Sequence, residues 1–175
     1  MHPKKKAWLA VNVIGGGAVL GSYVHGLLTH PDTRNQLWGS IPQELQAVYG
    51  VTMWLAAAGY FFFSYGLVVR ADAEEVRFGP FGFGLITALY AVIMAAAASW
   101  MPLTFAYFDD PSDALWLTIR VGLFAVGAGS VGLTVALFTM KPRAEGISGI
   151  LALLGLLFFC LQTAFLDAFV WPQFF

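Results

Sequence analysis

Five long apolar segments constrain this chain more than any other feature of its sequence. Their approximate bounds are Ala7–Leu28, Gln46–Val69, Phe81–Phe105, Ala114–Met140 and Ile147–Val170. An α-helix needs about 20 mostly apolar residues to cross the hydrocarbon core of a bilayer. The segments are too long for barrel strands and lack the alternating pattern of such strands. They fill nearly the whole chain, so we predict one all-α domain, 1–175, which is a polytopic membrane protein built as a bundle of five transmembrane helices.

The composition agrees with a lipid environment. The 175 residues are 59% hydrophobic and 11% charged, with a mean hydropathy of +0.74, whereas soluble domains are about 45–50% apolar and about 25% charged. A domain of this size cannot bury so much apolar surface, which argues against a soluble enzyme or a nucleic-acid-binding protein. The net charge of −1 implies no general attraction to an acidic partner. The single cysteine, Cys160, cannot form an intrachain disulfide, and its apolar surroundings predict a packing role.

The basic residues predict the orientation of the helices. Seven of them precede the first segment or lie in the second and fourth connections: Lys4, Lys5, Lys6, Arg70, Arg77, Lys141 and Arg143. Arg34 alone lies in a connection on the opposite side. Because basic residues concentrate on the cytoplasmic side, we expect a multi-pass protein of the cell (inner) membrane with a cytoplasmic N-terminus and an external C-terminus. The three glycines at 15–17 interrupt the first segment, so it is expected to be a retained signal anchor rather than a cleaved signal peptide.

The first connection, residues 29–45, is long for a link between helices. It contains Trp38 and turn-forming residues such as Pro31 and Pro42. Two interpretations stay open at this point. The loop acts as a lid over the outer end of the bundle, or it lies in the headgroup region with Trp38 as its anchor.

Small residues predict where helices pack closely. Gly17 and Gly21 have the small-xxx-small spacing of helix pairs in membranes, and Gly129 and Gly132 share one face of the fourth segment. Packing within the bundle is the simpler interpretation, and a homodimer through Gly17 and Gly21 is the other.

Polar groups inside apolar segments are expensive and typically functional. Arg120, Asp167 and His25 all lie toward the outer ends of their segments. Arg120 and Asp167 form an ion pair on one hypothesis. On others Arg120 reaches the headgroups while Asp167 faces water, or Arg120 stacks on Trp116. His25 is expected to be a packed bundle histidine, with proton exchange or ligand contact as the alternative. Its nearest companion, His30, lies in the following loop, which argues against a bis-histidine haem.

Two further polar residues, Gln162 and Thr163, are candidates for hydrogen bonds between helices. We find no nucleophile–base arrangement, so the sequence does not indicate an enzyme.

Several motifs resemble the tryptophan-rich sensory protein / translocator protein family. The first loop reads Trp38-Gly39-Ser40-Ile41-Pro42, and the second segment follows with Tyr49 and Trp54. The third contains Leu89-Tyr90 and then Trp100-Met101-Pro102-Leu103, and the fifth ends Ala164-Phe165-Leu166-Asp167-Ala168-Phe169-Val170-Trp171. The chain departs from the family pattern in having Ala96 and Ala97 where the family has an asparagine, Asp167 in place of an asparagine, and a single loop proline.

The resemblance implies a five-helix bundle, often dimeric, whose pocket opens toward the first loop and binds porphyrins or other flat apolar ligands such as sterols, with a sensory or transport role. The pocket candidates it implies are Trp38, Trp54, Tyr90, Trp100 and Asp167. To these we add Arg120, as a partner for a ligand carboxylate, and His25.

The alternative function is a small accessory subunit of a larger membrane complex, which fits the small size and the small-residue faces. A proton-coupled transporter ranks last because the chain lacks repeats and an inner charge relay.

Overall fold

A computed structural model describes residues 1–66, 72–142 and 146–175 of the chain. Its long helices are α1 (Pro3–Thr29), α2 (Gln43–Tyr65), α3 (Gly84–Asp109), α4 (Asp113–Thr139) and α5 (Gly146–Cys160). The last continues without a break through the π-helical η3 (Leu161–Val170) and the 3-10 helix η4 (Trp171–Phe174). All five are long and apolar enough to cross a membrane. The five predicted helices are therefore confirmed as helices, within a few residues of the expected bounds.

The differences in bounds have local causes. α2 begins directly after Pro42, because proline has no backbone N–H to donate within a helix and therefore favours a helix start. Residues 67–69 of the predicted second segment lie outside the described residues. α3 begins at Gly84 rather than at 81, because residues 77–81 form a short turn in which Phe78 and Phe81 bond to each other. α4 begins at Asp113, where the Ser112 side chain accepts a hydrogen bond from the Leu115 N–H at 3.3 Å.

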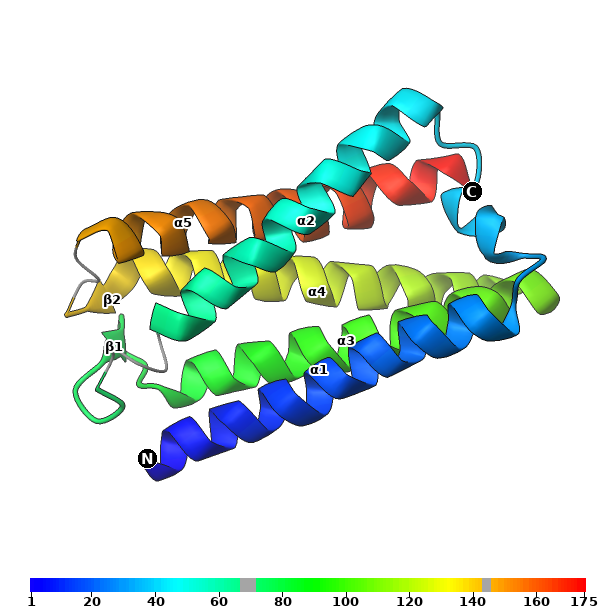
Figure 1. Cartoon of the computed structure of the whole chain (residues 1–175). Coiled ribbons are helices and arrows are strands. Elements are labelled where there is room, and N and C mark those ends of the chain that lie inside the picture. Colours follow the sequence, from blue (N-terminus) through cyan, green and yellow to red (C-terminus); the bar gives the residue numbers. More distant parts are fainter. Residues whose placement is uncertain (67–71, 143–145) are drawn as a thin grey trace.

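The helices alternate in direction, so the bundle has two distinct ends (Figure 1). We call one the N-terminal end. It contains the chain start and the antiparallel pair of β1 (Arg77–Phe78) and β2 (Met140–Lys141). The opposite first-loop end contains the first connection, with the 3-10 helix η1 (Arg34–Trp38), and the C-terminus. Five described Lys and Arg residues lie at the N-terminal end: Lys4, Lys5, Lys6, Arg77 and Lys141. Arg70 and Arg143, the two other basic residues predicted on this side, lie outside the described residues.

Neighbours in space are not always neighbours in sequence. α1 packs along α3, α3 along α4, α4 along α5 and η3, and α2 along α5. α2 crosses the bundle obliquely (Figure 1). It meets α1 and α3 in the N-terminal half, through the Tyr60–Asn12 and Ser64–Tyr90 hydrogen bonds, and lies beside α5 and η3 elsewhere. The α1–α3 pair therefore separates from α2 toward the first-loop end.

The closest helix contacts occur at glycines. A Cβ on Gly59 of α2 would strike the backbone of Gly155 of α5, and one on Gly129 of α4 would meet Ile93 of α3 at 2.5 Å. The predicted packing face at Gly129 and Gly132 is thus confirmed. Gly17 and Gly21 differ, because a Cβ on either would have no heavy atom within 4 Å. The interpretation of these two as packing residues within the bundle is therefore wrong.

Two clusters of buried side chains form the core. The N-terminal cluster surrounds Tyr90 and Phe63, and the first-loop cluster surrounds Tyr49 and Trp171. Hydrogen bonds cross between helices near the middle of the bundle. Thr163 donates to Ser130 of α4 at 2.8 Å, and Thr52 of α2 donates to Gln162 at 2.5 Å. The prediction that Gln162 and Thr163 bond across helices is confirmed.

Candidate functional site

Asp167 is the acidic side chain placed inside the first-loop half. It lies on η3 and is half-buried. Gln162 donates from Nε2 to its Oδ1 at 2.7 Å, and Gln162 in turn accepts from the Thr52 hydroxyl. Within the described residues, the second carboxylate oxygen accepts no hydrogen bond. The chain from Thr52 to Asp167 thus fixes the carboxylate and leaves one oxygen available.

The π-helical turn explains why Gln162 and Asp167 meet. A π-helix bonds residue i to residue i+5, so side chains five apart lie one above the other. In a regular α-helix the same two residues would point in different directions. π-Helical segments are rare in proteins, and those that occur are often found at functional sites. The sequence does not reveal this contact, because residues five apart lie on different sides of a regular α-helix.

Aromatic side chains from three elements form a series of ring contacts that begins beside the carboxylate. Tyr23 of α1 interacts electrostatically with Asp167. The Tyr23 ring lies against Trp100 of α3, with centroids 5.8 Å apart, and Trp100 meets Trp171 of η4 edge-on at 5.6 Å. The Trp100 Nε1 is buried and has no hydrogen-bond partner among the described residues. We call Asp167, Gln162, Tyr23 and Trp100 the Asp167 cluster.

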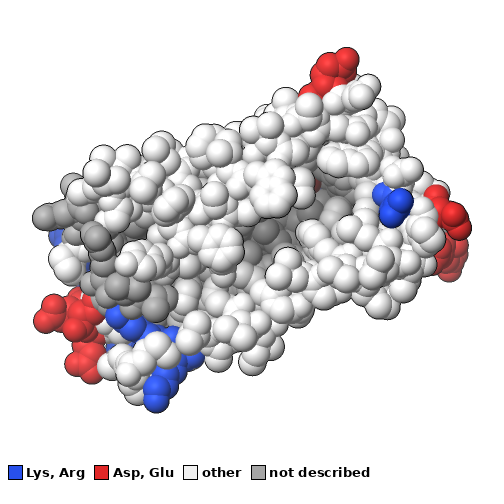
Figure 2. Space-filling model, viewed as in Figure 1, with Lys and Arg blue, Asp and Glu red and all other residues white. Residues whose placement is uncertain are grey.

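The Asp167 cluster belongs to the part of the bundle where α2 and the α1–α3 pair separate. Figure 2 shows this face of the molecule, which is hollowed between these helices toward the first-loop end. Tyr49 of α2 closes the other side of η3, where its hydroxyl donates to the Leu166 carbonyl at 2.7 Å. Tyr23, which interacts with Asp167 and packs on Trp100, thus places the carboxylate and the Trp100 indole in the same part of the first-loop half.

Of the residues predicted for the pocket, Trp100 and Asp167 lie in this cluster, and Trp38 lies nearby. Trp38 is half-buried and packs edge-on against Tyr49, with centroids 6.1 Å apart. Tyr90 lies elsewhere. It is 1% exposed in the N-terminal cluster, where its hydroxyl bonds to Ser64 at 2.9 Å. The structure therefore does not bring Tyr90 together with Trp100 and Asp167.

Two predicted residues lie on the outside of the bundle. The Trp54 side chain is 80% exposed on α2, and His25 is exposed on α1. The interpretation of His25 as a packed bundle histidine is wrong, because Gly26, the residue beside it, is the one that faces α3, where a Cβ would meet Met101 at 2.6 Å. Adjacent residues on a helix point in directions about 100° apart, so His25 is turned away from that contact.

Arg120 and Asp167 form no ion pair in the part of the chain that the structure describes. The Arg120 guanidinium lies over the Phe124 ring, 5.5 Å from its centroid, and Phe124 packs edge-on against Phe169 at 5.1 Å. Phe169 is two residues from Asp167, and residues two apart on a helix do not share a face. Arg120 is thus on the side of η3 away from the carboxylate. The predicted partner Trp116 packs instead on Tyr107 and Trp171.

The first loop is tied to the C-terminal segment. The backbone N–H and the hydroxyl of Ser40 both donate to the Phe174 carbonyl, at 3.1 and 3.0 Å, and Trp171 Nε1 donates to the Leu37 carbonyl at 2.9 Å. Gly39 has a φ of +51°, and a Cβ there would meet the Phe174 carbonyl oxygen at 2.5 Å. Only glycine fits both demands. The loop therefore covers the end of the bundle nearest the Asp167 cluster.

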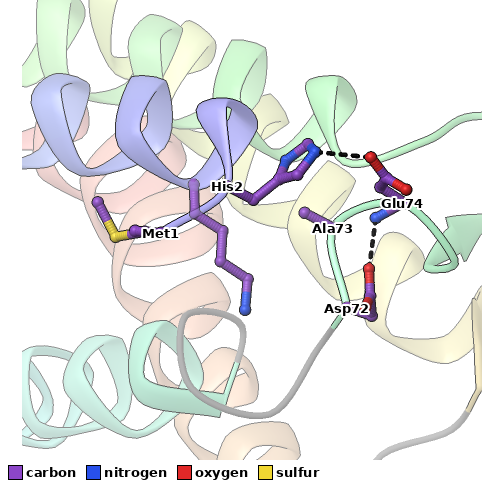
Figure 3. Close-up of a pocket in the computed structure, with 6 residues that line it drawn as sticks. Met1, His2, Asp72, Ala73 and Glu74 are labelled. Carbon is purple, nitrogen blue, oxygen red and sulfur yellow. Dashed lines mark hydrogen bonds and ion pairs between the residues drawn. The ribbon is translucent and has the colours of Figure 1, made fainter.

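The N-terminal end has a polar hollow of about 600 Å³ between the chain start and the turn at 72–74. Figure 3 shows His2 pointing toward Glu74, with 3.0 Å between Nε2 and Oε1. The Glu74 backbone N–H donates to Asp72 at 2.8 Å and lowers the pKa of that carboxyl. The described residues contain no group of three His, Cys, Asp or Glu side chains placed to hold a metal ion.

The fold and site define a bundle of five apolar helices with an acidic, aromatic cluster in one half. Comparison with protein-family models, with curated proteins and with solved structures finds no match to the chain. The resemblance to the tryptophan-rich sensory protein family stays a prediction that rests on the quoted motifs.

Proposed function

We propose that the five helices cross the cell (inner) membrane, with the N-terminal end in the cytoplasm and the first-loop end outside. The distribution of charge supports this orientation. The five described Lys and Arg residues of the N-terminal end contrast with the single Arg34 in the connections of the first-loop end, which also contains the acidic Asp109, Asp110 and Asp113. Basic residues are the stronger signal of orientation. Protease protection of Arg34 in sealed membrane vesicles tests the proposal.

Within that membrane protein, the proposed function is to bind a flat apolar ligand at the Asp167 cluster, in a sensory or transport role. The observation that carries it is the half-buried Asp167 with an unbonded oxygen, grouped with the aromatic rings of Tyr23 and Trp100. Intramembrane carboxylates are costly and typically mark ligand or ion sites. The aromatic faces suit a planar ring system. The resemblance to the sensory protein family supplies the ligand classes, which are tetrapyrroles and sterol-like molecules.

The polar groups of the cluster suggest how such a ligand lies. Asp167 accepts a hydrogen bond and Trp100 Nε1 donates one. A sterol hydroxyl satisfies both, and a tetrapyrrole offers pyrrole N–H groups to the carboxylate. A ligand carboxylate pointing at Asp167 would be repelled. Porphyrin propionates are thus expected to point away from Asp167, toward water, and Arg120 is not their partner.

Titration of the purified protein with protoporphyrin IX, followed by tryptophan fluorescence, tests the proposal. We expect saturable quenching that Trp100→Phe weakens, because this substitution removes a ring and a donor from the cluster. Trp54→Phe is the matched control, since the Trp54 side chain is 80% exposed on the outside of the bundle. Quenching that responds equally to both substitutions would reflect adsorption to the outer surface and would contradict the proposal. A sterol-like probe is titrated in parallel to separate the two ligand classes.

The second candidate function is that of an accessory subunit of a larger membrane complex. α1 favours it, because this helix packs along α3 and leaves Gly17 and Gly21 on an open face. Such faces let another helix approach closely. Purification from native membranes decides between the alternatives. A co-purifying protein that Gly17→Leu releases supports the subunit, a homodimer that the same substitution dissociates supports self-association, and a monomer excludes both.

A further inference from the structure

A second hollow lies on the outer surface of α4, near the first-loop end. It has a volume of about 340 Å³ and is lined by residues that recur at three- and four-residue steps, Asp113, Trp116, Leu117, Arg120, Val121 and Phe124. This spacing places all of them on one face of the helix. Leu117 and Val121 are 64% and 59% exposed, so the face is turned outward from the bundle. The hollow is separate from the Asp167 cluster.

Arg120 gives this hollow its chemistry. Its Nε is buried and has no hydrogen-bond partner in the described part of the chain, and the guanidinium lies over Phe124. No acidic side chain among residues 1–66, 72–142 and 146–175 forms an ion pair with it. A guanidinium in a low-dielectric setting is strongly stabilised by a nearby anion. Its planar set of N–H donors matches the oxygens of a phosphate. An anionic group supplied from outside the chain would satisfy it.

The order of charges along the hollow identifies that group. Arg120 lies seven residues after Asp113, or roughly 10 Å deeper along the axis at 1.5 Å per residue. Asp113 is exposed at the mouth of the hollow. A positive charge below a negative one is the reverse of a zwitterionic phospholipid, in which the phosphate lies nearer the acyl chains than the ammonium does. Trp116 lies between the two levels, where tryptophans favour the headgroup region.

We infer that this hollow is a binding site for a zwitterionic phospholipid such as phosphatidylethanolamine. The phosphodiester pairs with Arg120, the ammonium lies near Asp113, and an acyl chain follows Val121 and Phe124 at and below the level of Arg120. The inference rests on the membrane placement proposed above and does not depend on a ligand at Asp167. It assigns Arg120 to lipid contact rather than to the pocket.

Native mass spectrometry of the delipidated protein with added lipids tests the site. The probes are dioleoyl phosphatidylethanolamine, dioleoyl phosphatidylglycerol, dioleoylglycerol and soluble phosphoethanolamine. We expect phosphatidylethanolamine to bind most tightly. Dioleoylglycerol, which lacks a phosphate, is expected to bind at least about tenfold more weakly. Tight binding of soluble phosphoethanolamine would indicate a free-phosphate site and would overturn the lipid assignment. Equal binding of the lipid with and without a phosphate would also overturn it.

Two substitutions assign the charges. Arg120→Gln is expected to lower phosphatidylethanolamine binding about tenfold, and Arg34→Gln, in the exposed first loop at the same end, is the matched control. Asp113→Asn is expected to remove the preference for phosphatidylethanolamine over the anionic phosphatidylglycerol. Asp113 is exposed, so this substitution is expected to leave the fold intact. Unchanged binding in folded Arg120→Gln overturns the site, and so does a preference that persists in Asp113→Asn.

Extraction of native membranes with alkaline carbonate separates this inference from the proposals on which it depends. A chain that is released by carbonate is not inserted, and both the membrane placement and the lipid site then fail. A chain that stays in the membrane but shows no dependence on Arg120 removes the lipid site alone. Porphyrin quenching that survives Arg120→Gln confirms that the lipid and the Asp167 cluster act independently.

Discussion

The two halves of the bundle use similar residues in different ways. Each has an aromatic cluster, and each contains a buried indole N–H without a partner within the described residues, Trp8 in the N-terminal half and Trp100 in the first-loop half. In the N-terminal half α2 contacts α1 and α3, and the Tyr90 hydroxyl is matched by Ser64. In the first-loop half the helices separate, and one Asp167 oxygen accepts no hydrogen bond from the described residues. The N-terminal half is thus closed by contacts between helices, while the first-loop half is the more open one, on which the proposed ligand site depends.

The largest expected effect tests the close contact that holds α2 to α5. Gly59→Ala places a Cβ against the Gly155 backbone, which cannot move as a flexible side chain would. We expect the free energy of unfolding in detergent to fall by about 2–3 kcal/mol. Gly50→Ala on the same helix is the matched control, because a Cβ there has no heavy atom within 4 Å. Equal effects of the two substitutions would contradict this role for the glycine contact.

The next prediction concerns the satisfied hydroxyls of the N-terminal half. Tyr90→Phe removes the buried hydrogen bond between Tyr90 and Ser64, so we expect the free energy of unfolding to fall by about 1.5 kcal/mol. The same measurement on Tyr49→Phe in the first-loop half is expected to give about 1 kcal/mol, because the Leu166 carbonyl it releases is already part of a helix. A reversed order would show that the first-loop half is the better-packed one.

Asp167→Asn is expected to separate binding from stability. The amide oxygen still accepts from Gln162, so we expect the free energy of unfolding to change by less than about 1 kcal/mol. The dissociation constant for protoporphyrin IX is expected to rise about tenfold, because a neutral amide is a weaker acceptor than a carboxylate. Fluorescence titration and denaturation of the same samples measure both quantities. A large loss of stability with unchanged binding would make Asp167 a structural residue.

Trp171→Phe tests the attachment of the first loop. It removes the hydrogen bond to the Leu37 carbonyl, with an expected local cost of about 1 kcal/mol. That cost corresponds to about fivefold more frequent opening of the loop. Limited trypsin digestion at Arg34 measures it as faster cleavage. Trp54→Phe should leave the cleavage rate unchanged, and a rate that does not respond to Trp171→Phe would show that other contacts hold the loop.

The smallest expected effect belongs to the turn at the N-terminal end. The Glu74 N–H lowers the pKa of Asp72 below the ordinary value of an aspartate, so the folded state favours the ionised carboxylate. The resulting stabilisation is present above the unfolded pKa and is lost as the pH falls through the folded one. The difference in stability between the parent and Asp72→Asn should therefore shrink as the pH falls from 6 toward 3. A difference that grows over that range would contradict the assignment.

Hydropathy predicted the helices well, but it did not predict which way each helix faces. The span containing Trp54 was correctly placed, yet the side chain is 80% exposed on the outside. In a bilayer the lipid-facing side of a helix is as apolar as its packed side, so the pattern does not indicate rotation about the axis. His25 was placed wrongly for the same reason, and of the alternatives for Arg120 the ion pair with Asp167 does not form within the described residues. Gln162 and Thr163 were predicted correctly because polar side chains within a span need partners in the bundle.

The sequence by itself determined the five long apolar helices and the clustering of the described basic residues at one end of the bundle. These follow from the length of apolar runs and from where the charged residues fall between them, and neither depends on how the helices pack. The tertiary structure alone decided that α2 crosses obliquely to α5, that a π-helical turn brings Gln162 to Asp167, and that Arg120 faces outward. Each of these depends on contacts between residues far apart in the chain, which local hydrophobicity does not encode.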